Sequence, residues 1–513
     1  MKGKPSLTIA VCAWLCAAAG VLPAVAAHTN VFSLQQCFEL ALKRNLDVRI
    51  ERATTDVARF GLGAAYGAYD PVLSIEASHA YIDAPGDFSP QKHNFDFPYT
   101  MDTDHGGAGL AGLLPWGMNY TLESETGRKS ATTDFNINPG DAAEYPWGIR
   151  NTNNAFARAS MALRQHLLKD SWIDQSREVL AIRRAELKMS EAALRMEILK
   201  TMLGVELAYH DLASKRELVR VEEAGVKMRE AFLGETRRRV EVGDQPPLDL
   251  QHAETLLQNT VTALAAAREA WISGQNALKA LVSDDFRAWA DETLDPAATS
   301  SVIPPAASLQ RSFQLALRQR PDLLEARLAI ERSNVAVRFR YNQLFPSLDL
   351  VGRLGSSAVE PDASQAISTM LRQGDPQYMY GIVLTMPLTR TGQRNDYRRS
   401  KAEREISQLQ LKRAEEGVLV QVADWVNRVE SRYSQVGSTA KARSYAEAAL
   451  AAEQKKLQNG LTTPYFVLQY QEALTAAQRA EVLAVADYLK AQAQLAFAEG
   501  STLDRYHLAV EVR

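Results

Sequence analysis

Apolar and polar residues alternate along several short segments of the chain. The first runs from Val72 to Tyr81, with Leu73 and Ile75 on one face and Ser74 on the other. A period of two is that of a β-strand, and apolar-out, polar-in alternation over roughly ten residues is what a membrane barrel strand requires. We therefore predict about four strands of this kind. The other three lie at about 155–164, 347–354 and 378–388.

Much longer segments follow a helical period. Good helix formers run from about Trp172 to Gly234, and in the second half Val422, Val429 and Val436 are seven residues apart. A seven-residue repeat indicates coiled-coil-like packing. A helix of about 62 residues, at about 1.5 Å per residue, is roughly 90 Å long. Because the mean globular helix has only about 12 residues, we predict rods rather than the helices of a compact core.

A turn ends each rod. The first turn spans residues 242–249 and the second spans residues 459–464. Gly243 and Gly460 suit the left-handed conformation that ends a helix, and the proline that follows each of them can open the next helix. We therefore expect a return helix after each turn, so that each half of the chain contains one long helical hairpin.

The two halves of the chain are near copies. Ser33-Leu34-Gln35-x-x-Phe38 recurs as Ser308-Leu309-Gln310-x-x-Phe313, an offset of 275 residues that also relates Pro71 to Pro346. Both prolines end a helix just before a predicted strand. The duplication predicts two structurally equivalent halves. We assign 1–27 to a signal peptide, 28–284 to the first repeat, 285–307 to a linker and 308–513 to the second repeat.

The first half is longer than the second. His166 and Pro387 stand at matching strand ends, but His166 lies 95 residues after Pro71, whereas Pro387 lies 41 residues after Pro346. The 54 extra residues are rich in Gly, Asp, Asn and Phe. We expect them to form a longer surface hairpin.

The N-terminus has the features of a secretory signal. Lys2 and Lys4 precede an apolar stretch from Leu7 to Leu22, and small residues lead to a cleavage site near Ala27. The alternative, a membrane anchor helix, is less favoured because the apolar stretch is shorter than the ~20 residues that a span needs. Cleavage would leave Cys37 as the single cysteine, so we expect no internal disulfide.

Charge and motifs exclude several classes of function. The net charge is −3 without a long run of one sign, so no basic nucleic-acid-binding surface is expected. The sequence has no Gly-rich phosphate loop, His-Glu-x-x-His pair or Cys/His cluster with metal-ligand spacing. We therefore expect no catalytic residues, no cofactor, no metal site and no nucleic-acid partner.

The predicted strands raise a problem of closure. About four strands cannot form a barrel alone, and open strand edges are not tolerated in hydrocarbon. Either the strands lie outside the membrane or several chains share one barrel. Three chains would supply twelve strands, an even number within the known range. A duplicated protomer in a trimer also predicts a helical tunnel with pseudo-sixfold walls.

In the order of these features the chain resembles the TolC-like outer-membrane efflux family. The resemblance covers essentially all of the chain after the signal and rests on the paired Ser-Leu openings, the proline-ended helices before strands, the strand ends 163–168 and 384–388, and the two tip turns. It implies a mostly helical homotrimer, with a twelve-stranded barrel in the outer membrane and a long periplasmic helical tunnel. It also implies docking to a periplasmic adaptor and an inner-membrane pump.

The resemblance also suggests which tip residues matter. Drug-exporting members carry an Arg and then Asp residues at the second turn, which constrict the pore, whereas this chain has Thr462, Phe466 and Gln469 at the corresponding places. A ring of aspartates is therefore not expected, and the candidate constriction is Asp249, Phe466 and Gln469. Asp249 fits the aspartate that often follows the first turn and equally fits a helix cap. The expected adaptor contacts are Gly243, Asp244, Asp249, Gly460, Leu461 and Thr462.

A second departure concerns the strand end at His166, where the family often has proline, as this chain has at Pro387. The leading hypothesis is a passive export duct at the outer membrane, driven by an inner-membrane partner of an efflux or type I secretion system. The alternative is a periplasmic coiled-coil scaffold or adaptor that never spans the membrane. A barrel requires lipid-type alternation in both halves and a scaffold does not, so the strands distinguish the two.

Overall fold

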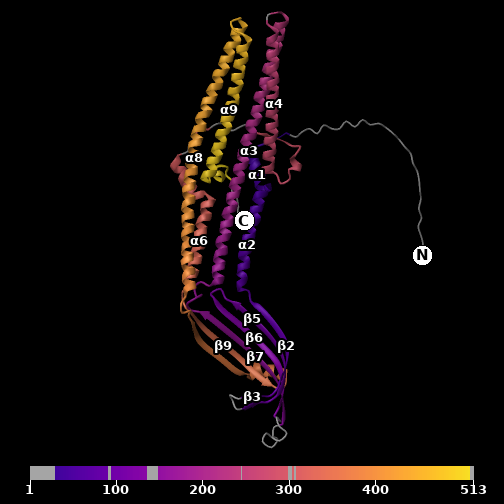
Figure 1. Cartoon of the computed structure of the whole chain (residues 1–513), viewed down its shortest axis with the longest axis vertical. Coiled ribbons are helices and arrows are strands. Elements are labelled where there is room, and N and C mark those ends of the chain that lie inside the picture. Colours follow the sequence, from indigo (N-terminus) through magenta and orange to yellow (C-terminus); the bar gives the residue numbers. More distant parts are fainter. Residues whose placement is uncertain are drawn as a thin grey trace, which may run out of the picture.

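The computed structural model describes residues 29–89, 94–135, 148–243, 245–297, 303–305 and 308–508. A sheet lies at one end of the molecule, and long helices extend from it to two tips at the other end (Figure 1). The predicted fold class, mostly helical with a sheet, is confirmed. The predicted signal peptide, residues 1–27, lies outside the described residues.

The helices repeat in the two halves of the chain. The first half contains α1 (Leu34–Arg44), α2 (Leu46–Tyr66), α3 (Gln175–Glu241) and α4 (Pro247–Val282). The second half contains α5 (Leu309–Gln319), α6 (Pro321–Asn342), α8 (Thr391–Gln458) and α9 (Pro464–Glu499). Two shorter helices are α7 (Ala363–Gln373) and α10 (Thr502–Arg505), and two 3₁₀ turns are η1 (Gly67–Tyr69) and η3 (Arg287–Trp289).

The start of each repeat is fixed by a local cap. Ser33 accepts a hydrogen bond from the backbone of Gln36 at 3.3 Å, and the Gln36 side chain accepts one from the backbone of Ser33 at 2.9 Å. This reciprocal capping box satisfies two backbone donors that the helix leaves unpaired. Ser308 accepts from the backbone of Arg311 in the same way. The duplicated serine therefore sets the first residue of both α1 and α5.

Each long helix has two antiparallel partners in succession. Helix α3 has 67 residues and packs against α2 near the sheet and against α4 near the tip. Helix α8 has 68 residues and pairs with α6 and then α9 in the same way (Figure 1). At about 1.5 Å per residue each is roughly 100 Å long. The expectation of rods rather than compact-core helices is confirmed.

One sheet collects six strands from both repeats. These are β2 (Val72–Ala84), β5 (Tyr99–Leu113), β6 (Met118–Asp134), β7 (Ile149–His166), β9 (Ser347–Glu360) and β10 (Asp375–Thr385), in the order β10-β9-β7-β6-β5-β2 with every pair antiparallel. Two small sheets pair β1 (Thr29–Phe32) with β8 (Thr293–Pro296) and β3 (Asp87–Ser89) with β4 (Asn94–Asp96).

The sheet corrects two sequence expectations. It has six strands per chain rather than about four, and the hairpin formed by the extra segment of the first half is part of this sheet rather than a surface addition. Strands β5 and β6, of 15 and 17 residues, stand between β2 and β7. The glycines of β5 obscure its alternation, and in β6 the alternation is evident only at its start, Met118–Glu123. These strands are held by pairing on both edges, which does not depend on an apolar pattern.

The main packed cores lie midway along the rods. In the first half, Phe38 and Cys37 of α1 pack against Ile198, Met202 and Leu212 of α3, and all are buried. In the second half the corresponding cluster is built by α5, α6, α8 and α9 and includes the buried residues Leu323, Val422, Val429, Tyr488 and Leu495. The short first helix of each repeat therefore packs against both the long helix and its return helix. Burial raises the pKa of the Cys37 thiol to about 11.

Nothing in the described part of the chain combines the helix length and hydropathy that a membrane-spanning helix requires.

A buried polar cluster attaches the C-terminal segment to α3. Tyr506 donates to Glu206 at 2.6 Å, while His210 lies 3.9 Å and Arg505 lies 3.8 Å from the same carboxylate. Glu206 is 1% exposed and His210 is 6% exposed. Burial, with the charges of Arg505 and Lys490, lowers the pKa of His210 from 6.5 to about 4. Burial raises the pKa of Glu206.

We predict that His210 weakens the fold in acid. The unfolded chain binds the histidine proton below about pH 6.5, but the folded chain binds it only near pH 4. The free energy of unfolding therefore falls by about 3 kcal/mol as the pH is lowered through this window. His210→Gln should remove this loss, as measured by the thermal unfolding midpoint between pH 7 and pH 4.

The raised pKa of Glu206 acts in the opposite direction, so the comparison of variant with wild type isolates the histidine. His252→Gln, at an exposed position, is the matched control. An acid dependence that is the same in wild type and His210→Gln would contradict this account.

Candidate functional site: the helix–sheet junction and the hairpin tips

The predicted junction residues lie where the chain passes between sheet and rods. Pro71 and Pro346 immediately precede β2 and β9, His166 is the last residue of β7, and Pro387 follows β10. All four therefore stand at the same end of the sheet, which is the end that meets the helices (Figure 1).

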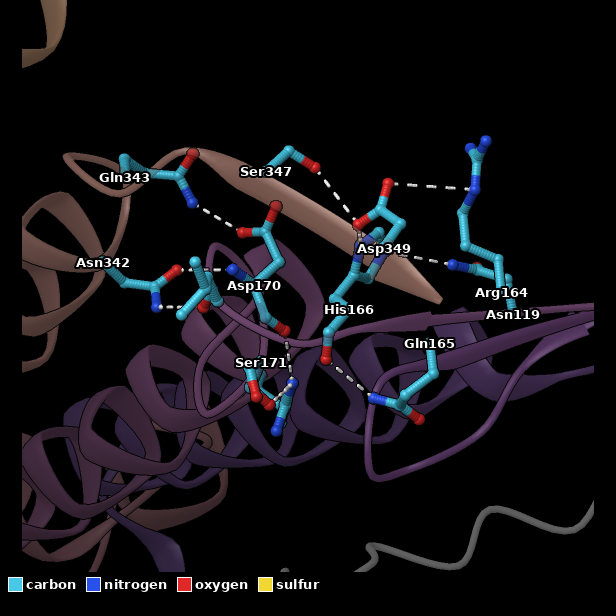
Figure 2. Close-up of polar contacts among 12 residues, drawn as sticks. Asn119, Arg164, Gln165, His166, Asp170, Ser171, Asn342, Gln343, Ser347 and Asp349 are labelled. Carbon is cyan, nitrogen blue, oxygen red and sulfur yellow. Dashed lines mark hydrogen bonds and ion pairs between the residues drawn. The ribbon is translucent and has the colours of Figure 1, made fainter. Parts of the chain in front are cut away.

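His166 forms a polar cluster that joins three strands. Its Nδ1 lies 2.7 Å from Asp349 Oδ1 on β9, and its Nε2 lies 3.3 Å from the Asn119 amide on β6 (Figure 2). Asp349 also accepts from Ser347 at 3.1 Å and lies 3.9 Å from Arg164. The carboxylate is 7% exposed, so it is held by partners rather than by water. Both repeats contribute to this cluster, because His166 belongs to the first and Asp349 to the second.

A second group of contacts joins the two repeats beside this cluster. Asn342, at the end of α6, accepts from the Asp170 backbone at 2.6 Å and donates to the Leu168 carbonyl at 3.3 Å. Gln343 donates to the Asp170 carboxylate at 2.6 Å (Figure 2). Arg177 donates to the carbonyls of Asp170 and Ser171 at 2.9 and 2.8 Å. The turn into α3 is therefore closed by side chains from both halves of the chain.

The turn into the other long helix has the same unusual backbone. Asp170 has φ of 63° and Arg390, just before α8, has φ of 49°. A residue with a side chain rarely adopts this left-handed conformation, so surrounding contacts must hold it. Arg390 donates to the Leu344 carbonyl at 2.9 Å, in the connection between α6 and β9. Both long helices therefore leave the sheet through hydrogen-bonded left-handed residues, which fix the direction of the rods.

We predict that Asp349 stabilises this junction. Asp349→Ala removes the acceptor of His166 and leaves a part-buried ring nitrogen unpaired, which costs roughly 1–3 kcal/mol. Asp349→Asn keeps an acceptor oxygen and should lose less. Thermal denaturation of the purified protein measures both, with Asp375→Ala, at an exposed aspartate of the same sheet, as the control. An Asp349→Ala variant as stable as the control would contradict the role.

The tip turns end the two long helices with glycine. Gly243 has φ of 79° and Gly460 has φ of 69°, and a Cβ at either residue would meet no neighbour. The glycines are therefore required by backbone conformation rather than by space. At the second tip the backbone of Leu461 donates to Lys456 at 2.9 Å and that of Gly460 donates to Leu457 at 3.1 Å, which is a Schellman motif. Asp244 lies outside the described residues.

The second turn is also held by a side chain. Thr462 donates to Glu453, which accepts from Lys456 at 2.9 Å. Leu461 projects from the same turn and is 76% exposed. Thr462 therefore has a structural partner, whereas the large apolar side chain of Leu461 is exposed.

Of the three candidate constriction residues, Asp249 lines a hollow near the tips and the other two do not. Asp249, in the first turn of α4, lines a hollow of about 470 Å³ between the two hairpins, together with His252 and Tyr465. Phe466 and Gln469 are exposed and do not line this hollow. Phe466 instead makes an edge contact with Tyr465, with ring centroids 5.7 Å apart.

A buried ion pair links the two hairpins toward the tips. Glu222 on α3 is 4% exposed, and Arg479 on α9 donates to both of its carboxylate oxygens, one at 2.7 Å. The two residues are 257 positions apart, so no sequence pattern could have paired them. The same limit applies to His166 and Asp349, which are 183 positions apart.

We predict that this pair holds the tips at a fixed separation. Arg479→Ala leaves a buried carboxylate without its partner, which strongly disfavours the packed arrangement. Spin labels at Val242→Cys and Leu461→Cys, both exposed, should then give a longer and broader distance distribution by electron paramagnetic resonance.

Arg268→Ala is the matched control, because Arg268 pairs with Glu223 within a single hairpin at 2.8 Å. Equal distance distributions in the two variants would rule out a special role for the link between hairpins.

Comparison with known proteins identifies the family. The chain matches the family of outer membrane efflux proteins over residues 172–283 and 313–501, which is more than half of its length. The chain belongs to the outer membrane efflux protein family. Such a protein acts in efflux at the cell outer membrane, as a channel component. The alternative of a periplasmic scaffold that does not span the membrane is not favoured.

Individual relatives agree with this assignment. The chain is 22% identical over 402 residues to the outer membrane efflux protein BepC of Brucella suis, covering 78% of this chain and 83% of that protein. The fold is similar to the outer membrane channel CmeC of Campylobacter jejuni, with a TM-score of 0.62 at 15% identity over 91% of this chain and 85% of that chain. It is also similar to VceC of Vibrio cholerae, with a TM-score of 0.63 at 18% identity over 91% and 96%.

Proposed function

We propose that this outer membrane efflux protein is a passive trans-periplasmic duct, formed by three copies of the chain and lacking catalytic residues of its own. The observation that carries the proposal is the combination, in one chain, of a two-faced sheet with rods roughly 100 Å long. The sheet has the alternation of a membrane barrel, and the rods have the length to extend far from the membrane.

The sheet edges support the assembly of several copies. Within the described residues β2 pairs only with β5, and β10 pairs only with β9, so each keeps one free edge. A free edge cannot remain unpaired in hydrocarbon, because no water is present to satisfy its N–H and C=O groups. A second copy of the chain offers the complementary edge.

Aromatic residues at the junction support a membrane boundary at that level. Trp172 packs on Phe345 with ring centroids 5.4 Å apart, and Phe345 packs on Tyr341 at 5.5 Å. Trp172 is 51% exposed and Tyr341 is 47% exposed. Exposed aromatic rings of this kind are typical of the water–lipid boundary of membrane barrels.

In this proposal the tips receive the partners. A periplasmic adaptor contacts the exposed turns at Gly243, Asp244, Asp249, Gly460, Leu461 and Thr462, and an inner-membrane pump supplies the energy. Asp249, Phe466 and Gln469 of the three copies form the constriction. The two repeats, 28–284 and 308–513, alternate around the tunnel, and residues 285–307 join them.

The test is oligomeric mass and conductance of the mature protein in planar bilayers. We expect a trimer with discrete single-channel steps, and we expect Phe466→Ala to change the step size if that residue lines the constriction. Leu248→Ala, an exposed residue at the first tip, is the control. A water-soluble species without conductance would overturn the duct.

A further inference from the structure

The inserted hairpin is a full part of the sheet. Strand β5 pairs with β2 along the whole length of β2, from Val72 to Ala84, and β6 pairs with β7 from Met118 to Asp134. The turn between β5 and β6 is closed by two backbone hydrogen bonds of 2.8 Å. The Leu114 N–H donates to the Met118 carbonyl, and the Gly117 N–H donates to the Leu114 carbonyl. Nothing in this pairing distinguishes the inserted strands from the others.

The hairpin continues both faces of the sheet in register. One row of paired residues crosses all six strands on the apolar face, and the hairpin supplies its second and third members. The row is Leu73, Leu110, Leu122, Met161, Leu354 and Tyr378. Five of these six side chains are among the exposed large hydrophobic residues, so the row forms a continuous band that lacks a cover within the described chain.

The opposite face is polar across the same strands. On β6, Glu123 lies 3.5 Å from Arg353 of β9, and Glu125 lies 3.3 Å from Arg158 of β7. Glycines of β5 lie beside Glu76 and leave a hollow of about 790 Å³ over this face. An apolar band on one face and charged residues on the other, at the same height, is the arrangement of a barrel wall between lipid and water.

The base of the hairpin lies on the same junction as the other strands. Gly117, in the turn between β5 and β6, has φ of 91°. A Cβ there would come within 2.6 Å of the Arg177 guanidinium at the start of α3. The glycine therefore permits both the turn and its close approach to the helix, which holds the hairpin at the level where the rods begin.

We propose that the β5–β6 hairpin widens the barrel, so that three copies of the chain close an eighteen-stranded wall in place of the twelve strands expected from the sequence. This inference rests on the proposed trimeric duct. The chain adds an even number of strands, so β2 of one copy meets β10 of the next in antiparallel orientation. Barrels of 16–18 strands enclose an aqueous channel, and barrel diameter grows roughly in proportion to strand number.

The wider wall has a consequence for transport. With six strands per copy, the barrel lumen is about one and a half times as wide as a twelve-stranded barrel of the same tilt. Its lining includes the paired charges of Glu123, Glu125, Arg158 and Arg353 from each copy. The membrane segment therefore suits large hydrated solutes, and discrimination by size falls to the helical tips.

The decisive experiment is electron cryo-microscopy of the mature protein in lipid nanodiscs, with its mass measured in parallel. A trimer with eighteen wall strands supports the proposal. A trimer with twelve wall strands and the hairpin outside them overturns the wider barrel but leaves the duct intact. A dimer that closes twelve strands also overturns it. A monomer that stays in water overturns the duct itself, which is a different result.

A shortened variant gives an independent test. Replacement of residues 85–148 by a short glycine-containing turn removes both inserted strands and lets β2 pair with β7, with Leu73 opposite Met161 as in the existing row. We expect a trimer with a twelve-stranded wall about two-thirds as wide. A wall of unchanged width in this variant would show that the hairpin does not form part of the barrel. If the shortened variant does not fold, the strand count of the full chain still distinguishes an eighteen-stranded wall from a twelve-stranded one.

Discussion

Each strand in hydrocarbon must have both edges paired, and this requirement constrains the rest of the molecule. The sheet satisfies it internally for β9, β7, β6 and β5 but leaves one edge of β2 and one of β10 free within the described chain. In the proposed duct, further copies of the chain supply the partners of these two edges. In the proposed assembly the duplicated rods follow the same arrangement, because two long hairpins extend from the sheet of each chain (Figure 1).

Rods of this length need a rigid attachment to transmit position from one end to the other. The junction provides it through side chains from both repeats, above all His166 with Asp349 and Asn342 with Asp170. Toward the tips the two hairpins are joined by the Glu222–Arg479 and Asp211–Lys490 ion pairs and by an apolar cluster that includes Phe232 and Leu450. The two hairpins are thus tied together both at the sheet and toward the tips.

The features that follow from local chemistry were predictable from the sequence. The serines that begin α1 and α5, the prolines before β2 and β9, and the positive φ of the tip glycines were all recognisable from residue type and repeat. Contacts between distant residues were not, because no periodic pattern relates Glu222 to Arg479 or β1 to β8. The hairpin of β5 and β6 was expected, but its place inside the sheet was not, since glycines and charges there replace many of the apolar residues that mark a membrane strand, while Leu110 and Leu122 keep the band continuous.

The inserted hairpin also limits how such a wall can evolve. A single added strand would reverse the direction of every later strand and would bring parallel edges together between copies, so growth must come in hairpins. Because each change in the gene is repeated in every copy, the proposed threefold assembly would gain or lose strands in multiples of six. A family built in this way can therefore change its pore width only in large steps, with no intermediate sizes between them.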